Sequence, residues 1–313
     1  MSSKAFQEST IILSAPPPST HTGDDTPPIH KVLPCFKLFQ PVGPAIPLVV
    51  DSPHSGGIFP EDFHFTCSIH DLRASEDSYV DQFGAKVPQA GGTFIKALVS
   101  RAYIDLNRAV GDLHPDICDS PIPWQIHRSK RVMYGLGLIR HLIRFGEPVY
   151  DGPLPLADIK HRIQHYYHPY YEVLGQALTQ AHEQFGRVLH VNIHSTPNIG
   201  VDGAPQPDII LGDHDGHSCG RIYRDTIKRY FESCGLRVVV NNPYKGVELT
   251  RRFSRPRQGY HSIQIEINKA LYMDEATLAF NDTQPEMQQI MNGLWDYLAQ
   301  TILAGVQMPK AAE

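Results

Sequence analysis

The chain has 313 residues, of which 41% are hydrophobic and 19% are charged, so it is long enough to fold around a sizeable core. Its 28 basic and 33 acidic residues give a net charge of −5, which argues against a protein that binds nucleic acid through a basic surface. No apolar run approaches the roughly 20 residues that span a bilayer. The N-terminus also lacks the apolar stretch of a signal peptide, so we expect a cytoplasmic protein without a membrane segment.

The two ends of the chain differ in composition from the rest. Residues 1–31 are rich in Pro, Thr and Asp, which cannot build a core, and we predict a flexible tail there. Residues 32–307 are expected to form one domain, and residues 308–313 a loose C-terminus. The five cysteines are widely spaced, odd in number and free of any C-x-x-C pair, which is typical of reduced thiols in a cytosolic protein.

Strand and helix patterns alternate along the domain. Short, nearly continuous apolar runs predict strands at residues 47–50, 94–99, 103–106, 188–193, 208–211, 236–240 and 263–267. Longer patterns predict helices at residues 76–88, 156–185, 221–234 and 285–303, with a break or kink in the second at Pro169. This alternation favours an α/β domain around a largely parallel or mixed sheet.

Two histidines directly follow predicted strands. His54 lies in the turn DSPHSGG after residues 47–50, and His194 ends the run of residues 188–193. In open α/β sheets, ligands bind beyond the carboxyl ends of the strands. If the two strands are neighbours, both imidazoles can bind one metal ion. If they are not, each histidine is a turn residue without a role.

Three carboxylates are candidates for the same chemistry. Ser75 is a possible helix cap, and the helix dipole favours acidic residues in the first turn of a helix. This structural role is the simpler interpretation of Glu76 and Asp77. Either one is also a candidate third metal ligand. Glu266 lies on the polar side of the alternating strand 263–267, where it is either an exposed residue or a general base beside a metal-activated water.

Basic and amide side chains flank the predicted strand 103–106. Arg101, Asn107 and Arg108 form either a surface cluster of ion pairs or a clamp for an acidic substrate, because arginine forks bind carboxylates bidentately. Together with the strand-end histidines and the carboxylates, these residues are the components of a zinc hydrolase that acts on an acidic amide.

From residue 48 to residue 275 the chain resembles the N-formylglutamate amidohydrolases. The segments that carry the resemblance match in order and spacing; they are DSPHSGGIFPEDF, SEDSYVDQF, SRAYIDLNR, GLGLIR, HRIQHYYHPYYEVL, VNIHSTPN, PDIILGDHDGHSC and QIEINKALYMDE. The family is similar in design to the zinc carboxypeptidases and aspartoacylases. The resemblance therefore implies a three-layer α/β/α fold with a central mixed, largely parallel sheet, and makes residues 32–307 a single catalytic amidohydrolase domain.

The resemblance also implies the chemistry. It predicts one catalytic zinc ion, with other divalent metals as alternatives, and hydrolysis of the amide of a small acidic N-acyl amino acid. The typical substrate is N-formyl-L-glutamate, which yields L-glutamate and formate in one route of bacterial histidine degradation. The resemblance gives no oligomeric state.

Individual residues follow from the same resemblance. His54 and His194 are expected to bind zinc, with a carboxylate from Glu76 or Asp77, a choice that stays open. In the carboxypeptidases the glutamate ligand follows the first histidine by three residues, which here falls on Gly57. Glu266 matches the catalytic glutamate, and Arg101 matches a residue that polarises the scissile carbonyl. The expected substrate contacts are Asn107, Arg108, Arg140 and Arg251.

Three positions depart from the family pattern. Val247 stands where a second glycine is usual, Arg252 where histidine is common, and His214 where arginine is common. These loops are expected to border the substrate. They motivate a first alternative, an amidase for a different N-acyl amino acid or small amide. A second alternative is a zinc- or carboxylate-binding protein without catalysis.

Overall fold

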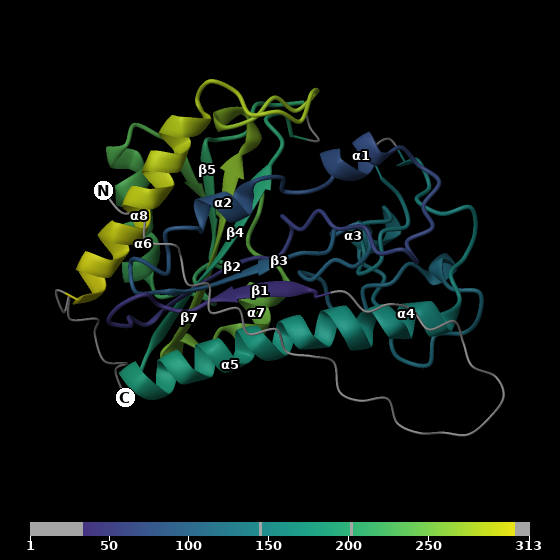
Figure 1. Cartoon of the computed structure of the whole chain (residues 1–313), viewed down its shortest axis with the longest axis horizontal. Helices are drawn as coiled ribbons and strands as arrows, with labels where there is room; N and C mark the ends of the chain where they lie inside the picture. Colours follow the sequence, from purple (N-terminus) through teal and green to yellow (C-terminus); the bar gives the residue numbers. More distant parts are fainter. Residues whose placement is uncertain (1–33, 144–145, 201–202, 304–313) are drawn as a thin grey trace, which may run out of the picture.

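The structure, a computed structural model, describes residues 34–143, 146–200 and 203–303, which form a mixed sheet with helices on both faces (Figure 1). The predicted tail 1–31 and the predicted loose end 308–313 lie outside the described residues. The sheet order is β1-β3-β2-β4-β7-β5-β6. The strands are β1 (Phe36–Phe39), β2 (Leu48–Ser52), β3 (Thr93–Ala97), β4 (Val188–Thr196), β5 (Ile209–Gly212), β6 (Val238–Val240) and β7 (Tyr260–Asn268).

The centre of the sheet is parallel and its outer pairings are mixed. Strand β2 runs parallel to β3 and β4, β4 runs parallel to β7, and β5 runs parallel to β6. The pairs β1–β3 and β5–β7 are antiparallel. This arrangement confirms the predicted α/β fold with a mixed, largely parallel sheet.

Helices cover the two faces of the sheet and bury two separate apolar clusters. One face carries α4 (Leu156–Arg162), α5 (His168–Phe185) and α7 (Glu248–Phe253), and the other carries α2 (Val80–Phe83), α6 (Arg221–Ser233) and α8 (Gln284–Leu303). The short helices α1 (Ile69–Ala74) and α3 (Lys130–Met133) lie in the connecting loops. None of the described helices is long and apolar enough to cross a bilayer.

Strands β4 and β7 each place a row of alternating polar residues on one face of the sheet. Their isoleucines, valine and leucine pack against α6 and α8, and successive strand residues point to opposite faces. The alternate positions therefore face α5; they are His190, Asn192 and His194 on β4 and Ser262, Gln264 and Glu266 on β7. The parallel register places His194 directly beside Glu266.

One strand prediction is wrong and one strand was missed, each for a physical reason. Residues 103–106 form turns rather than a strand, with the amide of Asp105 donating to Leu138 O at 2.7 Å. Their apolar side chains pack in the core without a strand partner, which a short apolar run does not reveal. Strand β1 was not predicted, because it is a half-buried edge strand of only four residues.

The helix predictions need similar corrections. Within the predicted helix 76–88 only α2 is regular, and turns follow it. The expected break at Pro169 is instead a π-helical segment, Ile163–Tyr167, that joins α4 to α5. The wider π turn accommodates a residue that has no N–H and whose ring would clash with the preceding turn.

Trp295 on α8 gives a direct test of the packing between α8 and α2. The side chain is fully buried, and its indole Nε1 donates to Phe83 O at 2.6 Å. We expect Trp295→Ala to lower the free energy of unfolding by about 3–5 kcal/mol, because it leaves a large cavity and an unpaired carbonyl. Urea unfolding followed by circular dichroism measures this, with the exposed Gln300→Ala as control; a loss below about 1 kcal/mol would contradict the packing.

Candidate functional site

Two histidines and one aspartate converge near the carboxyl ends of β2 and β4, with His54 just after β2 and His194 inside β4. The possible ligand atoms of His54, Asp77 and His194 lie within 4.8 Å of one another, and all three residues are buried. His194 Nδ1 lies 2.8 Å from Asp77 Oδ2, and His54 Nδ1 lies 3.4 Å from the same oxygen. The structure therefore brings together the histidines that the sequence placed at two separate strand ends.

The local chain path explains why these residues meet. Strands β2 and β4 are parallel neighbours, so their carboxyl ends share one edge of the sheet. The backbone N–H of Asp77 donates to His54 O at 3.1 Å, which fixes the acidic loop beside the first histidine. Tyr79, two residues later, has a left-handed φ of 68° and turns the chain into α2. Such strained backbone persists where the surrounding structure holds it in place.

The far side of each imidazole is held by a hydrogen-bond partner. His54 Nε2 lies 2.6 Å from Asp105 Oδ1, and His194 Nε2 lies 2.7 Å from Asn192 Oδ1. With Nε2 as the donor in both rings, both Nδ1 atoms direct a lone pair toward Asp77. His54 Nδ1 is buried and has no hydrogen-bond partner among the described residues. Two imidazoles with anchored N–H groups and one carboxylate form a donor set that suits zinc.

The charges at the centre also suit a metal ion. Burial opposes the ionised form of Asp77, but the positive charge of Arg101 holds the pKa of its carboxyl well below the usual range. Burial, together with the neighbouring His54, lowers the pKa of His194 to about 4. At neutral pH the site therefore presents an ionised carboxylate and a neutral His194, the forms in which these groups bind metals.

Glu76 points away from this centre. Its carboxylate accepts hydrogen bonds from Ser100 Oγ and from Arg73 Nη1, the latter at 3.1 Å. Arg73 also donates to Gly57 O at 2.7 Å, and a Cβ at Gly57 would lie 2.2 Å from Arg73 Nη1. The guanidinium thus occupies the space beside the position where the carboxypeptidase spacing would put a ligand. Of the two acidic candidates, only Asp77 lies with the histidines.

Three arginines lie near the centre; Arg108 and Arg140 are buried and Arg101 is partly buried, and Arg140 differs from the other two. Arg101 donates to Asp105 Oδ2 at 2.8 Å and to Asp77 Oδ1 at 3.3 Å. Arg108 donates to two backbone carbonyls. Arg140 is 7% exposed, its Nε has no partner, and no carboxylate pairs with it within the described ranges.

Arg140 is therefore suited to an anionic ligand. Burial, together with Arg101, lowers the pKa of its guanidinium to about 9, and Asp77 and Asp105 act on it in the opposite direction. A buried cation without a directly paired carboxylate is costly, and a substrate carboxylate would relieve that cost.

Glu266 and Asn107 lie next to His194. Glu266 is buried on β7, and its Oε1 accepts a hydrogen bond from Gln264 Nε2 at 2.5 Å. Burial, and then the charge of Asp77, raises the pKa of Glu266 well above its ordinary value. Asn107 Nδ2 lies 3.0 Å from His194 Nε2, and its Oδ1 accepts the amide N–H of Leu249 at 2.9 Å. Asn107 therefore links the start of α7 to the centre.

Arg251 is not part of the buried cluster. Its side chain is 65% exposed on α7 and forms an ion pair with Glu248. The polar partners Asp105 and Asn192 were not among the predicted site residues. Asn192 had a visible signal, because it alternates with two histidines along a strand that is otherwise apolar.

Two of the three residues that depart from the expected pattern contact each other. His214 Nε2 lies 3.2 Å from Val247 O and 3.0 Å from Thr250 Oγ1. The third, Arg252, pairs with Glu248 and lies over the ring of Tyr171. Val247 directly precedes α7 and Arg252 lies on it, and the amide of Leu249 in the same helix donates to Asn107.

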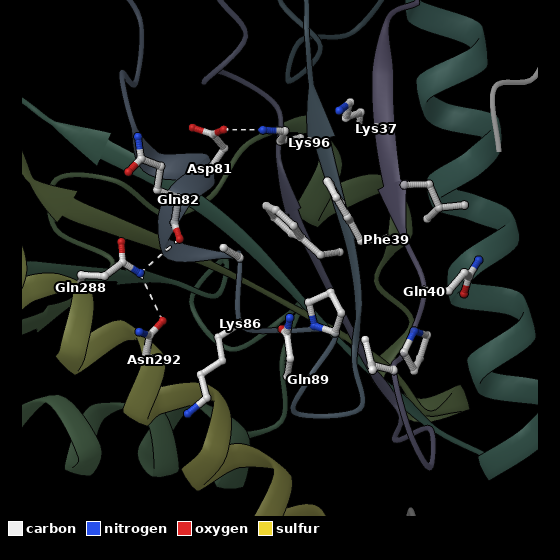
Figure 2. A pocket seen from close by; sticks show the side chains of 16 residues that line it. Lys37, Phe39, Gln40, Asp81, Gln82, Lys86, Gln89, Lys96, Gln288 and Asn292 are labelled. Atoms are coloured by element: carbon white, nitrogen blue, oxygen red, sulfur yellow. Dashed lines mark hydrogen bonds and ion pairs between the residues drawn. The ribbon is translucent and has the colours of Figure 1, made fainter. Parts of the chain in front are cut away.

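A separate pocket of about 790 Å³ is lined by residues of β1, α2 and α8, among others (Figure 2). Two of its lysines are already paired, Lys96 with Asp81 at 2.8 Å and Lys86 with Asp296. None of the residues of the histidine centre lines this pocket. The candidate chemistry therefore belongs to the strand-end centre and not to this pocket.

Residues 46–273 match the family model described as N-formylglutamate amidohydrolase. The chain belongs to this family. A crystal structure of N-formylglutamate amidohydrolase from Ralstonia eutropha JMP134 is 37% identical and superimposes with a TM-score of 0.84, covering 87% of this chain and 99% of that one. N-formylglutamate deformylase from Pseudomonas putida is 28% identical over 247 residues, which are 74% of this chain and 83% of the relative. The deformylase from Pseudomonas aeruginosa is 25% identical over 242 residues, with the same coverage.

Membership in the N-formylglutamate amidohydrolase family agrees with the resemblance of the sequence segments. The matched residues 46–273 include the histidine centre, Glu266 and the three arginines Arg101, Arg108 and Arg140. The relatives described above are N-formylglutamate deformylases and an N-formylglutamate amidohydrolase, which are amide hydrolases, so the chain is an enzyme of this class.

Proposed function

We propose that this enzyme hydrolyses N-formyl-L-glutamate to L-glutamate and formate with one zinc ion. The observation that carries the proposal is the convergence of two imidazole Nδ1 atoms and the Asp77 carboxylate beside Glu266 and the uncompensated Arg140. The names of the relatives support the substrate. A cytoplasmic location and a place in histidine degradation belong to the same proposal; all five cysteines are free, which supports the location.

His54, Asp77 and His194 would hold the metal ion, through Nδ1 of each ring and the carboxylate. A bound zinc ion lowers the pKa of water and polarises a carbonyl, and other divalent metals with an affinity for imidazole suit the same donors.

The residues of the chain supply the remaining steps. Glu266 accepts the proton of the attacking water and returns it to the leaving amine, and its position beside His194 supports this role. Arg101, held by Asp105 and Asp77, stabilises the oxyanion of the tetrahedral intermediate. Arg140 and Arg108, with Asn107, hold the carboxylates of the substrate. The predicted contact between the substrate and Arg251, whose side chain is exposed on α7, stays a prediction.

Release of formate from N-formyl-L-glutamate tests the proposal. We expect turnover by the purified protein, loss of turnover after chelation, and recovery when zinc is returned. Turnover of another N-acyl amino acid only, in zinc-loaded protein, would favour the alternative amidase, which the His214 and Val247 contact motivates. Tight binding of N-formyl-L-glutamate without any turnover would instead indicate a binding protein.

Arg140→Gln tests the anchor for the substrate carboxylate. We expect kcat/KM for N-formyl-L-glutamate to fall about 10- to 150-fold, mainly through KM, because one charge-assisted interaction of about 1.5–3 kcal/mol is lost. The loss shrinks for N-formylnorvaline, which lacks the side-chain carboxylate, if Arg140 binds that group. Arg251→Gln is the control and changes kcat/KM less than threefold. Equal losses in the two variants would contradict the anchor role of Arg140.

A further inference from the structure

A group of buried polar residues lies behind His194, on the face of the sheet that α5 covers. Asn192 and Asp51 are both 0% exposed. Asn192 Oδ1 lies 2.7 Å from His194 Nε2, and Asn192 Nδ2 donates to Asp51 Oδ1 at 2.7 Å. The proposed chemistry assigns no role to Asp51. Through hydrogen bonds, however, only Asn192 stands between Asp51 and the candidate metal ligand His194.

The carboxylate of Asp51 determines how the Asn192 amide is oriented. Asp51 also accepts hydrogen bonds from Tyr170 OH at 2.9 Å and from His190 Nε2 at 2.9 Å, so it is surrounded by donors. His190 is itself oriented by Ser262, whose Oγ lies 2.7 Å from His190 Nδ1. Because a carboxylate only accepts, the NH₂ group of Asn192 faces Asp51 and its carbonyl oxygen faces His194.

The carbonyl oxygen of Asn192 in turn selects the tautomer of His194. An oxygen 2.7 Å from Nε2 favours a proton on that nitrogen, and in that tautomer the lone pair of Nδ1 is directed toward Asp77. The NH₂ group of Asn107 lies 3.0 Å from the same Nε2, and it has an acceptor of its own in Asn192 Oδ1 at 3.3 Å. The tautomer with Nε2–H therefore satisfies all three side chains.

The opposite tautomer is the competing state. A proton on Nδ1 would donate to Asp77 Oδ2, which lies 2.8 Å away, and this ring could not bind a metal through Nδ1. We propose that Asp51 is a positioning residue that acts through Asn192 to hold His194 in the tautomer that presents Nδ1 to a metal ion. This inference rests on the proposed metal centre and extends it to a residue on the adjacent strand.

The tautomer can be read directly in protein from which metal has been removed. Long-range ¹H–¹⁵N correlations of the imidazoles distinguish Nε2–H from Nδ1–H, and His194→Gln assigns the signal. We expect Nε2–H in the wild type and a shift toward Nδ1–H in Asp51→Asn, whose amide no longer fixes the orientation of Asn192. Zinc affinity, titrated against a competing chelator, is expected to fall roughly 10- to 100-fold in this variant, as for other outer-sphere partners of metal ligands.

Two further variants separate positioning from general stability. Asn192→Ala removes the oxygen itself while Asp51 keeps its other donors, and we expect the same shift in tautomer and the same loss of zinc affinity. Tyr170→Phe removes a different hydrogen bond of Asp51 and is expected to change zinc affinity less than threefold. Double-mutant coupling supports a single route if Asp51→Asn with Asn192→Ala loses no more affinity than the larger single variant.

The proposal is overturned if metal-free wild-type protein carries Nδ1–H on His194. It is also overturned if Asp51→Asn and Asn192→Ala leave either the tautomer or the zinc affinity unchanged. Both readouts are made without substrate. A wild type that binds zinc but releases no formate would therefore count against the proposed function and not against the role of Asp51.

Discussion

Glu266→Gln is expected to lose about 10²- to 10⁴-fold in kcat while the bound zinc stays the same, since general acid–base catalysis typically contributes that much. The substitution keeps the shape of a side chain that is buried beside His194, and an amide oxygen still accepts the hydrogen bond of Gln264 Nε2. Only the ability to take and return a proton is lost. Formate release and metal analysis on the same preparation measure the two quantities, and a kcat within tenfold of the wild type would remove Glu266 as the base.

The dependence of kcat on pH provides an internal control for Glu266→Gln. A general base acts in its ionised form, so kcat rises as the pH passes upward through the pKa of the base. Burial and Asp77 raise the pKa of Glu266, which puts the acidic limb of the wild-type profile above the ordinary range of a glutamate. We expect that limb to be absent from Glu266→Gln. Bound metal is measured at each pH to separate loss of the base from loss of the ion.

Asp77→Asn is expected to weaken zinc binding by roughly 100-fold or more. This loss is larger than the loss expected when a hydrogen-bond partner of a metal ligand is replaced, because Asp77 would bind the ion directly. The neutral amide is a poor ligand, and it also leaves Arg101 with one carboxylate partner in place of two. Activity at limiting zinc falls with occupancy and recovers in part at high zinc. Competitive chelator titration gives the affinity.

Glu76→Gln is the matched control for the choice between the two adjacent carboxylates. Its side chain binds Ser100 and Arg73 and not the histidines, so we expect zinc affinity within threefold of the wild type. Stability is expected to fall by about 1.5–3 kcal/mol, because charged hydrogen bonds are weakened. If Glu76→Gln lost the metal and Asp77→Asn retained it, the arrangement of the centre would be wrong.

Much of the centre could be predicted from the sequence because strand periodicity is a strong local signal. The alternation in residues 263–267 puts Glu266 on the polar face, and the apolar run before His194 puts that residue near the end of a strand, although β4 continues to Thr196. Strand pairing then brings them together. The periodicity did not give the neighbours of each strand, which depend on contacts between distant segments, and here β4 lies between β2 and β7.

The choice between Glu76 and Asp77 shows what local patterns leave open. The two residues are adjacent, both are acidic and both are buried. Their directions differ because Arg73 beside Gly57 holds one of them, while the backbone bond to His54 O fixes the other. Likewise, residues 103–106 look like a strand by composition, although their burial comes from packing against the loops around Leu138. Neither result is encoded in a short window of sequence.

The place of β4 in the sheet has a consequence for synthesis on the ribosome. This strand pairs with residues 48–51 on one side and with residues 260–268 on the other. Strand β7 is complete 72 residues after β4 ends, at residue 268 against residue 196. At the typical elongation rate of about 5–20 residues per second, roughly 4–14 s separate the two. During that interval the nascent chain exposes the unpaired backbone edge of β4 and the surface that α8 later covers. A nascent chain that stalls before residue 260 therefore lacks both the base Glu266 and a completed sheet, and it becomes a substrate for chaperones and proteases rather than a partial enzyme.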